Sequence, residues 1–164
     1  MEFKVRIRGI DTIIRDLAKI DQNTYYAARD GVNEAADYLL GVVRNKIGKY
    51  QPTGGDPGGS GRWKKLKWET VKRKAVKYGG KGDRPLLAST KLRDSFSVVE
   101  GGKGRLSASV GSDSQYLIHH VYGAPRAGVP MRDPIKITAI EEKDTCHEII
   151  EDKIMEVINK SWGI

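Results

Sequence analysis

The alternation of apolar and polar residues is most regular in the second half of the chain, where it predicts a β-hairpin. Phe96 and Val98 alternate with serines, and residues 106–110 repeat the alternation with Leu, Ala and Val. A period of two places the apolar side chains on one face of each strand. Residues 101–104 between the strands include three glycines, which adopt the positive φ angles of tight connections at little cost.

Apolar segments on both sides of the hairpin extend this pattern. Residues 86–92 form a leucine-rich lead-in, and residues 116–123 place two histidines between hydrophobic neighbours. Both segments fit a half-buried antiparallel sheet, which has one face on the core and the other in water.

The first third of the chain predicts one further strand and two helices. Residues 3–7 alternate apolar and basic side chains, as a strand with one charged face does. Residues 11–20 and 25–47 then repeat apolar residues every three or four positions, which predicts two helices with one buried face each. Gly48 stands where a helix commonly ends.

The longer of these helices contains two interior glycines, Gly31 and Gly41. Each costs up to about 1 kcal/mol relative to alanine, because glycine loses more backbone freedom in a helix. Two explanations stay open from the sequence: another element approaches the helix backbone closely at these positions, or the helix simply tolerates them.

Two more helical patterns follow. The first covers residues 63–78 and predicts that Trp63, Leu66 and Tyr78 share one apolar stripe. The second covers residues 138–162, with acidic residues expected in its first turns, where the helix dipole favours them. Its apolar face is expected to pack on the sheet and consists of Cys146, Ile149, Ile150, Ile154, Val157 and Ile158.

These elements together predict an α+β fold. We expect a small, mainly antiparallel sheet packed against a long N-terminal helix and a C-terminal helix, with flexible, glycine-rich basic loops. Residues 1–164 suit one domain, because a chain of this length can bury a single core. Composition predicts a mobile loop at residues 49–62, named the glycine-rich loop below, and a second flexible break at residues 79–84.

The chain has a net charge of +8, but basic and acidic residues are concentrated in different segments. Residues 43–84 hold thirteen Lys or Arg against three acids, and residues 141–160 hold seven acids against three lysines. Opposite charges of this kind either neutralise each other within one chain or pair neighbouring copies head to tail. The sequence leaves both possibilities open.

The basic segment presents candidate residues for an assembly or DNA-facing surface. One interpretation is a basic, aromatic-containing helix that binds nucleic acid, and the other is a solvated lysine face over a packed Trp63. We favour the second interpretation. The candidate surface residues are Arg62, Lys64, Lys65, Lys67, Lys72 and Arg73.

The sequence also indicates several absences. No apolar run approaches the roughly 20 residues that span a bilayer, so we expect no membrane contact and synthesis in a cytoplasm. The histidine pair His119 and His120 cannot converge on one ligand, because adjacent side chains diverge on a strand or a helix. The same holds for Cys146 and His147. We therefore expect no catalytic residues, no cofactor, no metal and no small-molecule substrate.

Four short motifs follow one another along the last two thirds of the chain. They read W-x-x-L…T from Trp63, L-L-x-S-x-x-L-R-x-S-F from Leu86, V-G-x…Y-x-x-x-H-x-x-G from Val110, and V-P-x-R from Val129. In order and spacing they resemble the virion morphogenesis and tail-completion proteins of long-tailed bacteriophages.

Two positions depart from this resemblance. Thr90 stands where a glycine is expected, and residues 133–135 read Asp-Pro-Ile where Pro-Phe-Leu is expected. The second departure removes an aromatic side chain that would anchor the segment.

The resemblance implies a structural virion protein of a phage or prophage. Such a protein is assembled in the cytoplasm of the bacterial host and acts at the neck or tail end in tail completion and head-tail joining. It is expected to form a ring with copies of itself, to contact other neck or tail proteins and to lie near passing DNA. The alternative is a basic nucleic-acid-binding module without a virion role. The motif residues expected to be structural are Trp63, Leu66, Leu92, Ser95, Tyr116, His120, Gly123, Pro130 and Arg132.

Overall fold

A long helix, α2 (Gln22–Lys46), forms the axis of the molecule in the computed structural model, which describes residues 22–58, 60–79, 82–87, 89–101 and 105–162. The predicted strand at residues 3–7 and the predicted helix at residues 11–20 lie outside these residues. The helix α2 matches its prediction, and Gly48 follows its end with a φ of 90°. Its buried stripe mixes small and large side chains, among them Ala28, Val32, Ala35, Leu39 and Val43.

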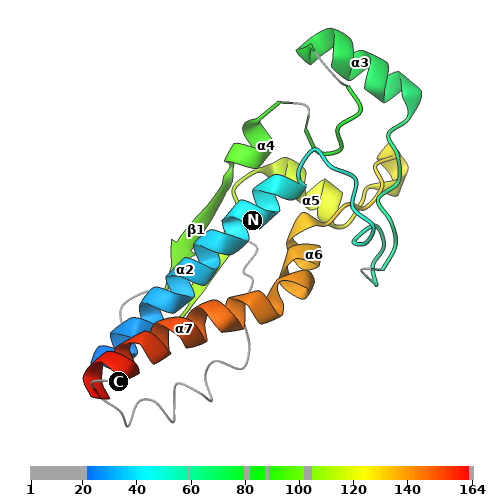
Figure 1. Ribbon diagram of the computed structural model, residues 1–164. Coiled ribbons are helices and arrows are strands. Elements are labelled where there is room, and N and C mark those ends of the chain that lie inside the picture. Colours follow the sequence, from blue (N-terminus) through cyan, green and yellow to red (C-terminus); the bar gives the residue numbers. More distant parts are fainter. Residues whose placement is uncertain (1–21, 59, 80–81, 88, 102–104, 163–164) are drawn as a thin grey trace.

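The second long helix, α7 (Lys143–Trp162), runs side by side with α2 in the opposite direction (Figure 1). Cys146, Ile150 and Ile154 are buried against α2, as their helical spacing predicts. A Cβ atom added at Gly31 would lie 3.0 Å from the Cα atom of Ile150. Close approach therefore explains Gly31, whereas Gly41 has open space around it and is merely tolerated.

The predicted C-terminal helix is divided in two. The helix α6 (Pro134–Glu141) begins earlier than expected, because the Asp133 side chain caps it by accepting hydrogen bonds from the backbone N–H groups of Ile135 and Lys136. Glu142, with φ −102° and ψ 10°, separates α6 from α7. Glu141 and Glu142 consequently lie at the end of α6 rather than in the first turn of a helix.

The predicted hairpin is present as β1 (Phe96–Glu100) and β2 (Ala108–Ser112). The strands are antiparallel, with Phe96 opposite Ser112 and Val98 opposite Val110. Phe96 and Val110 are buried and Val98 is half-buried, so the period-two pattern is confirmed. The strand β2 begins two residues later than the alternation from Leu106 predicts.

The two segments that flank the hairpin are not strands, so the sheet has two strands among the described residues. Before it lies the short helix α4 (Lys91–Asp94), and after it lies α5 (Gln115–Val121), followed by the 3-10 turn η1 (Pro125–Ala127). The expectation that residues 116–123 fit into the antiparallel sheet is wrong. Leu117 and Val121 are four residues apart and bury one face of a helical turn, a spacing that a short apolar run does not distinguish from a strand.

Buried side chains form two clusters. The first cluster contains side chains of α2 and α7 together with Val110 of the hairpin. The second joins the end of α2 to Trp63, Phe96, Leu117 and Ile135. The fold is α+β as predicted, but α7 packs chiefly on α2 rather than on the sheet. No helix among the described residues is long and apolar enough to cross a membrane.

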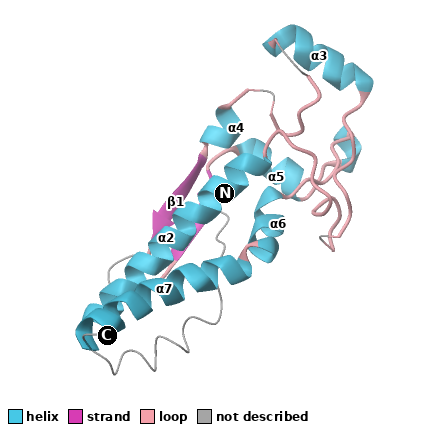
Figure 2. Cartoon of the chain, viewed as in Figure 1, coloured by secondary structure: helices cyan, strands magenta, loops and turns pink. Residues whose placement is uncertain are grey.

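The helix α3 (Trp68–Tyr78) stands away from α2, α7 and the hairpin, at the other end of a long loop region (Figures 1 and 2). It begins five residues later than the predicted start at Trp63. Trp63 is held in the second core cluster, and the chain from there to Lys67 is extended. The predicted stripe of Trp63, Leu66 and Tyr78 is therefore wrong, although Trp63 itself is buried.

Candidate assembly surface

The basic arm, which we define as residues 62–78, is attached to the core through Trp63. This side chain is only 3% exposed and packs in the second core cluster. Its backbone N–H donates to the carbonyl of Gln51 over 3.0 Å, and a Cβ atom at Gly54 would lie 3.2 Å from its Nε1. Trp63 thus fills the space beneath the glycine-rich loop and anchors the start of the arm.

The glycine-rich loop is irregular, as its composition predicts, but its backbone is bonded at several points. Gly55 donates to Gly61 over 2.6 Å, and the backbone N–H of Asp133 donates to Gly54 over 3.0 Å. The carboxylate of Asp56 accepts hydrogen bonds from Ser60. These bonds oppose motion of the loop, whose predicted mobility stays a prediction.

Two polar side chains hold the extended part of the arm. Arg132 is buried, and its Nη2 donates to the carbonyl of Lys64 over 2.6 Å. The hydroxyl of Tyr50 accepts from the backbone N–H of Leu66 over 2.9 Å and donates to the carboxylate of Asp83. Both partners on the arm are backbone groups, so these two hydrogen bonds do not depend on the side chains at Lys64 and Leu66.

The inner side of α3 rests on the segment that follows it. Gly82 is buried, and a Cβ atom added there would lie 2.1 Å from the carbonyl oxygen of Val71, so only glycine permits this approach. The ammonium group of Lys74 donates to the carbonyl of Arg84. These contacts determine which face of α3 points away from the molecule.

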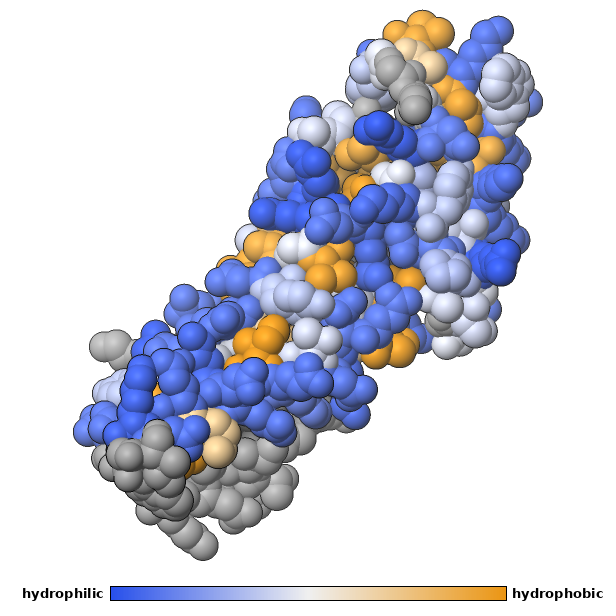
Figure 3. All heavy atoms as spheres, in the orientation of Figure 1, coloured by the Kyte–Doolittle hydropathy of each residue, from blue (hydrophilic) through white to orange (hydrophobic). Residues whose placement is uncertain are grey.

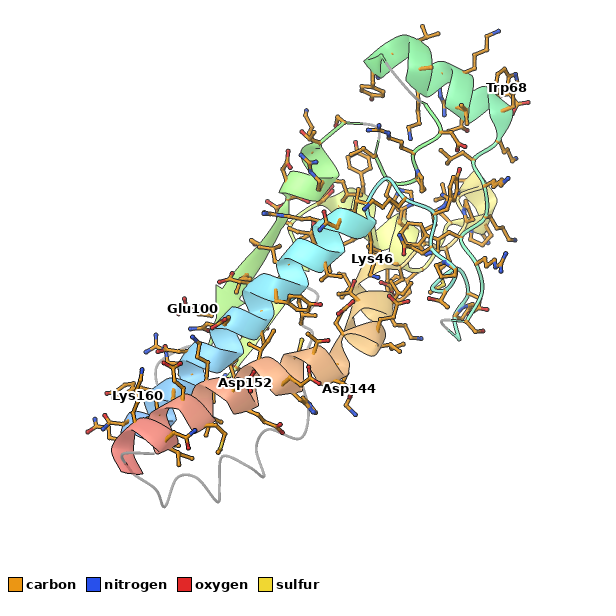
Figure 4. All side chains as sticks on the ribbon, viewed as in Figure 1. Lys46, Trp68, Glu100, Asp144, Asp152 and Lys160 are labelled. Carbon is orange, nitrogen blue, oxygen red and sulfur yellow. The ribbon has the colours of Figure 1, made fainter. Side chains whose placement is uncertain are left out.

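The outer face of α3, which we define as Trp68, Lys72 and Val76, is open to solvent. These residues are spaced four apart and therefore line one side of the helix. Trp68 is 71% exposed and Val76 is 83% exposed, and α3 has no buried residue. Figure 3 shows hydrophobic atoms at this end of the molecule among hydrophilic ones, and Figure 4 shows Trp68 at the start of the helix.

All six basic residues predicted for the assembly or DNA-facing surface are exposed. None of them takes part in the ion pairs that the structure shows for the described residues. Arg62, Lys64, Lys65 and Lys67 lie on the extended part of the arm, and Lys72 and Arg73 lie on α3. The structure thus brings all six to one projecting element.

The acidic face of α7 lies far from this arm (Figure 4). We define it by exposed residues on the side of α7 opposite to its buried stripe: Asp144, Glu148, Glu151, Asp152 and Met155. None of its four carboxylates forms an ion pair in the described part of the chain. The two charged segments of the sequence are joined by Lys46 and Glu141, whose Nζ and Oε2 atoms are 2.5 Å apart.

Three titratable side chains, Arg132, His120 and Lys74, lie close together where the arm meets the rest of the molecule; Arg132 is buried and the other two are half-buried. The pKa of His120 is lowered to about 4, chiefly by burial and to a smaller extent by the charges of Arg132, His119 and Lys74. Burial also lowers the pKa of Lys74, with the charge of Arg132 as a second cause. The Nδ1 of His120 and the Nε of Arg132 are buried without a hydrogen-bond partner in the described residues.

The remaining motif residues have varied surroundings. Ser95 lies in the core region, where its hydroxyl donates to the carbonyl of Leu92 over 2.8 Å and is 2.6 Å from the hydroxyl of Ser112. Gly123 has a φ of 70° and faces the backbone of residue 131, which requires glycine. Leu66, Leu92 and Pro130 are partly buried.

Tyr116 differs from these residues, because it is 76% exposed. The packing role expected for it from the motif is therefore not found within this chain.

Sequence reasoning missed Trp68 and Val76 as surface residues, because the helical phase was counted from Trp63. The four-residue spacing of Trp68, Lys72 and Val76 was the available signal. No group of three or more His, Cys, Asp or Glu residues in the described ranges is arranged to hold a metal ion. Burial raises the pKa of the Cys146 thiol to about 11, which disfavours the reactive thiolate.

The class of protein that this geometry defines is an α+β domain with a projecting basic arm. No protein-family model matches the chain, and neither the curated proteins nor the solved structures include a match.

Proposed function

We propose that this chain is a structural, non-catalytic virion protein of a tailed phage or prophage, which acts at the neck or tail end in head-tail joining. Its partners are copies of itself in a ring and other neck or tail proteins, and it is assembled in the host cytoplasm. The motifs from Trp63 to Arg132 support the proposal through their resemblance to tail-completion proteins.

The observation that carries the proposal is the basic arm. An element with six exposed basic residues and an exposed tryptophan is held by Trp63, Arg132 and Tyr50, whose contacts leave its outer face unobstructed. Exposed apolar residues surrounded by charged ones are typical of surfaces that bind another macromolecule. A fixed arm of this kind suits assembly, because it loses little conformational entropy on docking.

A second candidate function is favoured by the position of Trp68. An aromatic ring that is open to solvent beside Lys67 and Lys72 can stack on a base while the lysines contact phosphates. The chain would then be a basic nucleic-acid-binding module. This function predicts a salt-sensitive affinity of the isolated chain for DNA.

A tail-joining reaction with separated heads and tails tests the proposed function. The triple variant Lys64→Glu, Lys65→Glu, Lys67→Glu should fold normally and lower the yield of joined particles. The matched control carries Lys91→Glu, Arg105→Glu and Arg126→Glu, which changes the same total charge at exposed positions outside the basic arm.

Normal yields with the triple variant would contradict the basic arm as the assembly contact. Equal losses with both triple variants would assign the effect to net charge alone. Loss of DNA affinity in the arm variant, together with normal joining, would instead support the nucleic-acid-binding function.

A further inference from the structure

Two surfaces of this chain are each without a partner in the described residues and complement one another. The outer face of α3 presents an apolar residue on either side of a lysine, and Arg73 and Lys77 are exposed beside it. The acidic face of α7 presents four carboxylates along the helix and ends at Met155, which is 50% exposed. One surface thus combines basic residues with exposed apolar side chains, and the other combines acidic residues with an exposed methionine.

The two faces cannot meet within one molecule. Figure 1 places α3 at one end of an elongated chain, whereas α7 runs from the middle to the other end, and both are held there by contacts with their own surroundings. A contact between them therefore requires a second copy. Because each copy contributes a different surface, the contact is heterologous and generates a ring where the rotation closes.

Their lengths also agree. At a rise of about 1.5 Å per residue, α3 is about 16 Å long, and the stretch of α7 from Asp144 to Met155 covers about the same distance. Two helices of this length can pack side by side with Val76 next to Met155. The lysines of one helix then lie within reach of the carboxylates of the other.

We propose that the outer face of α3 docks on the acidic face of α7 in a second copy of this chain. This contact rests on the proposed function and specifies the self-association surface of the ring. A single helix pair buries less than the roughly 800 Å² per partner of a standard interface, so the isolated contact is weak and depends on salt. Ring closure then strengthens it by raising the effective concentration of each contact.

A second copy fits both faces better than DNA does. Phosphates would be attracted to Lys72 and Arg73, but DNA bound there would leave the carboxylates of α7 without a partner. Pairing between copies neutralises both faces at once. DNA binding by the arm without self-association is therefore a distinct outcome of the test.

Cysteine cross-linking between full-length chains tests the contact. One chain carries Val76→Cys and the other carries Met155→Cys, both at exposed positions, and the native Cys146 is 1% exposed with a raised pKa. At low salt with a mild oxidant, disulfide formation between the two chains should be on the order of tenfold faster than with a chain carrying Val99→Cys in place of Val76→Cys, because docking raises the effective concentration of the thiols. Val99 is an exposed residue of β1.

Charge changes then test the electrostatic match. Lys72→Glu and Arg73→Glu in the Val76→Cys chain should reduce the cross-link to the level of the Val99→Cys control. Glu148→Lys and Glu151→Lys in the Met155→Cys chain should restore it. Salt of ~1 M, at which the screening length is about 3 Å, should weaken the cross-link between the chains of native charge.

Equal cross-linking from Val76→Cys and Val99→Cys, no cross-link at low salt, or no restoration by the opposite charges would each overturn the proposed contact. The proposed function fails separately, by normal head-tail joining with the triple variant of the arm. If head-tail joining requires the arm but no cross-link forms, the proposed function stands and the contact between α3 and α7 is ruled out.

Discussion

The body of the molecule, which consists of α2, α7 and the hairpin, and the basic arm use their side chains in opposite ways. The body buries its regular apolar stripes, with Cys146, Ile150 and Ile154 against α2. The arm buries Trp63 and displays Trp68, although the two tryptophans are only five residues apart. Residues of the same type therefore stabilise the fold in one place and form a surface in the other.

The comparison shows how a projecting element is held without a core of its own. In the body, apolar area removed from water supplies the stabilisation. In the arm, Arg132 and Tyr50 bond to backbone groups of Lys64 and Leu66, and buried Gly82 allows close contact with α3. Elements with few buried apolar contacts open more readily, so the arm is expected to open at lower free energy than the body.

The two tryptophans give the largest expected difference. Trp63→Ala should lower the free energy of unfolding by about 3 to 5 kcal/mol, because it leaves a cavity in the second core cluster. Trp68→Ala is the matched control and should change stability by no more than about 0.5 kcal/mol. Denaturant unfolding of both variants measures this. Similar losses in the two variants would remove the distinction between anchor and surface.

The next prediction concerns pH and His120, whose pKa is lowered in the folded chain. His120 has a folded pKa of about 4, below its ordinary value of 6.5, so at intermediate pH the unfolded chain binds a proton that the folded chain does not. Stability is therefore lost as pH falls from 6.5 to about 4. Between about pH 7 and pH 5 this costs about 2 kcal/mol.

His120→Gln removes this titration and should make stability less dependent on pH over the same range. His119→Gln changes an exposed neighbour and is the control. Denaturant unfolding at several pH values provides the comparison. If the free energy of unfolding depends on pH in the same way in the native and His120→Gln chains, folding does not lower the pKa of His120 and the prediction is wrong.

The last comparison is between the two glycines of α2. Gly31→Val should cost about 1 to 3 kcal/mol, because the added atoms force α7 away at Ile150. Gly41→Val should leave stability unchanged or slightly higher, since valine has a better helix propensity than glycine and meets nothing there. Thermal unfolding of the two variants measures this difference in stability. Equal destabilisation at both positions would mean that the interface between α2 and α7 does not depend on close approach.

The sequence by itself determined the elements whose apolar spacing repeats several times. The stripes of α2 and α7 and the alternation of the hairpin predicted both helices, both strands and the α+β class, because a long periodic pattern allows one buried face. The exposure of the six basic residues was predictable for a related reason, since several adjacent lysines cannot be buried without partners.

Tertiary structure decided the elements whose local signal is short. Residues 116–121 are helical because Leu117 and Val121 fit the second core cluster, and residues 63–67 are extended because Trp63 is bound there. Because Trp63 is bound in the core, α3 begins only at Trp68, and both Trp68 and Val76 are exposed to solvent. A period is read correctly only from residues that share an element, and the start of α3 is set by contacts with residues distant in the sequence, which no local pattern contains.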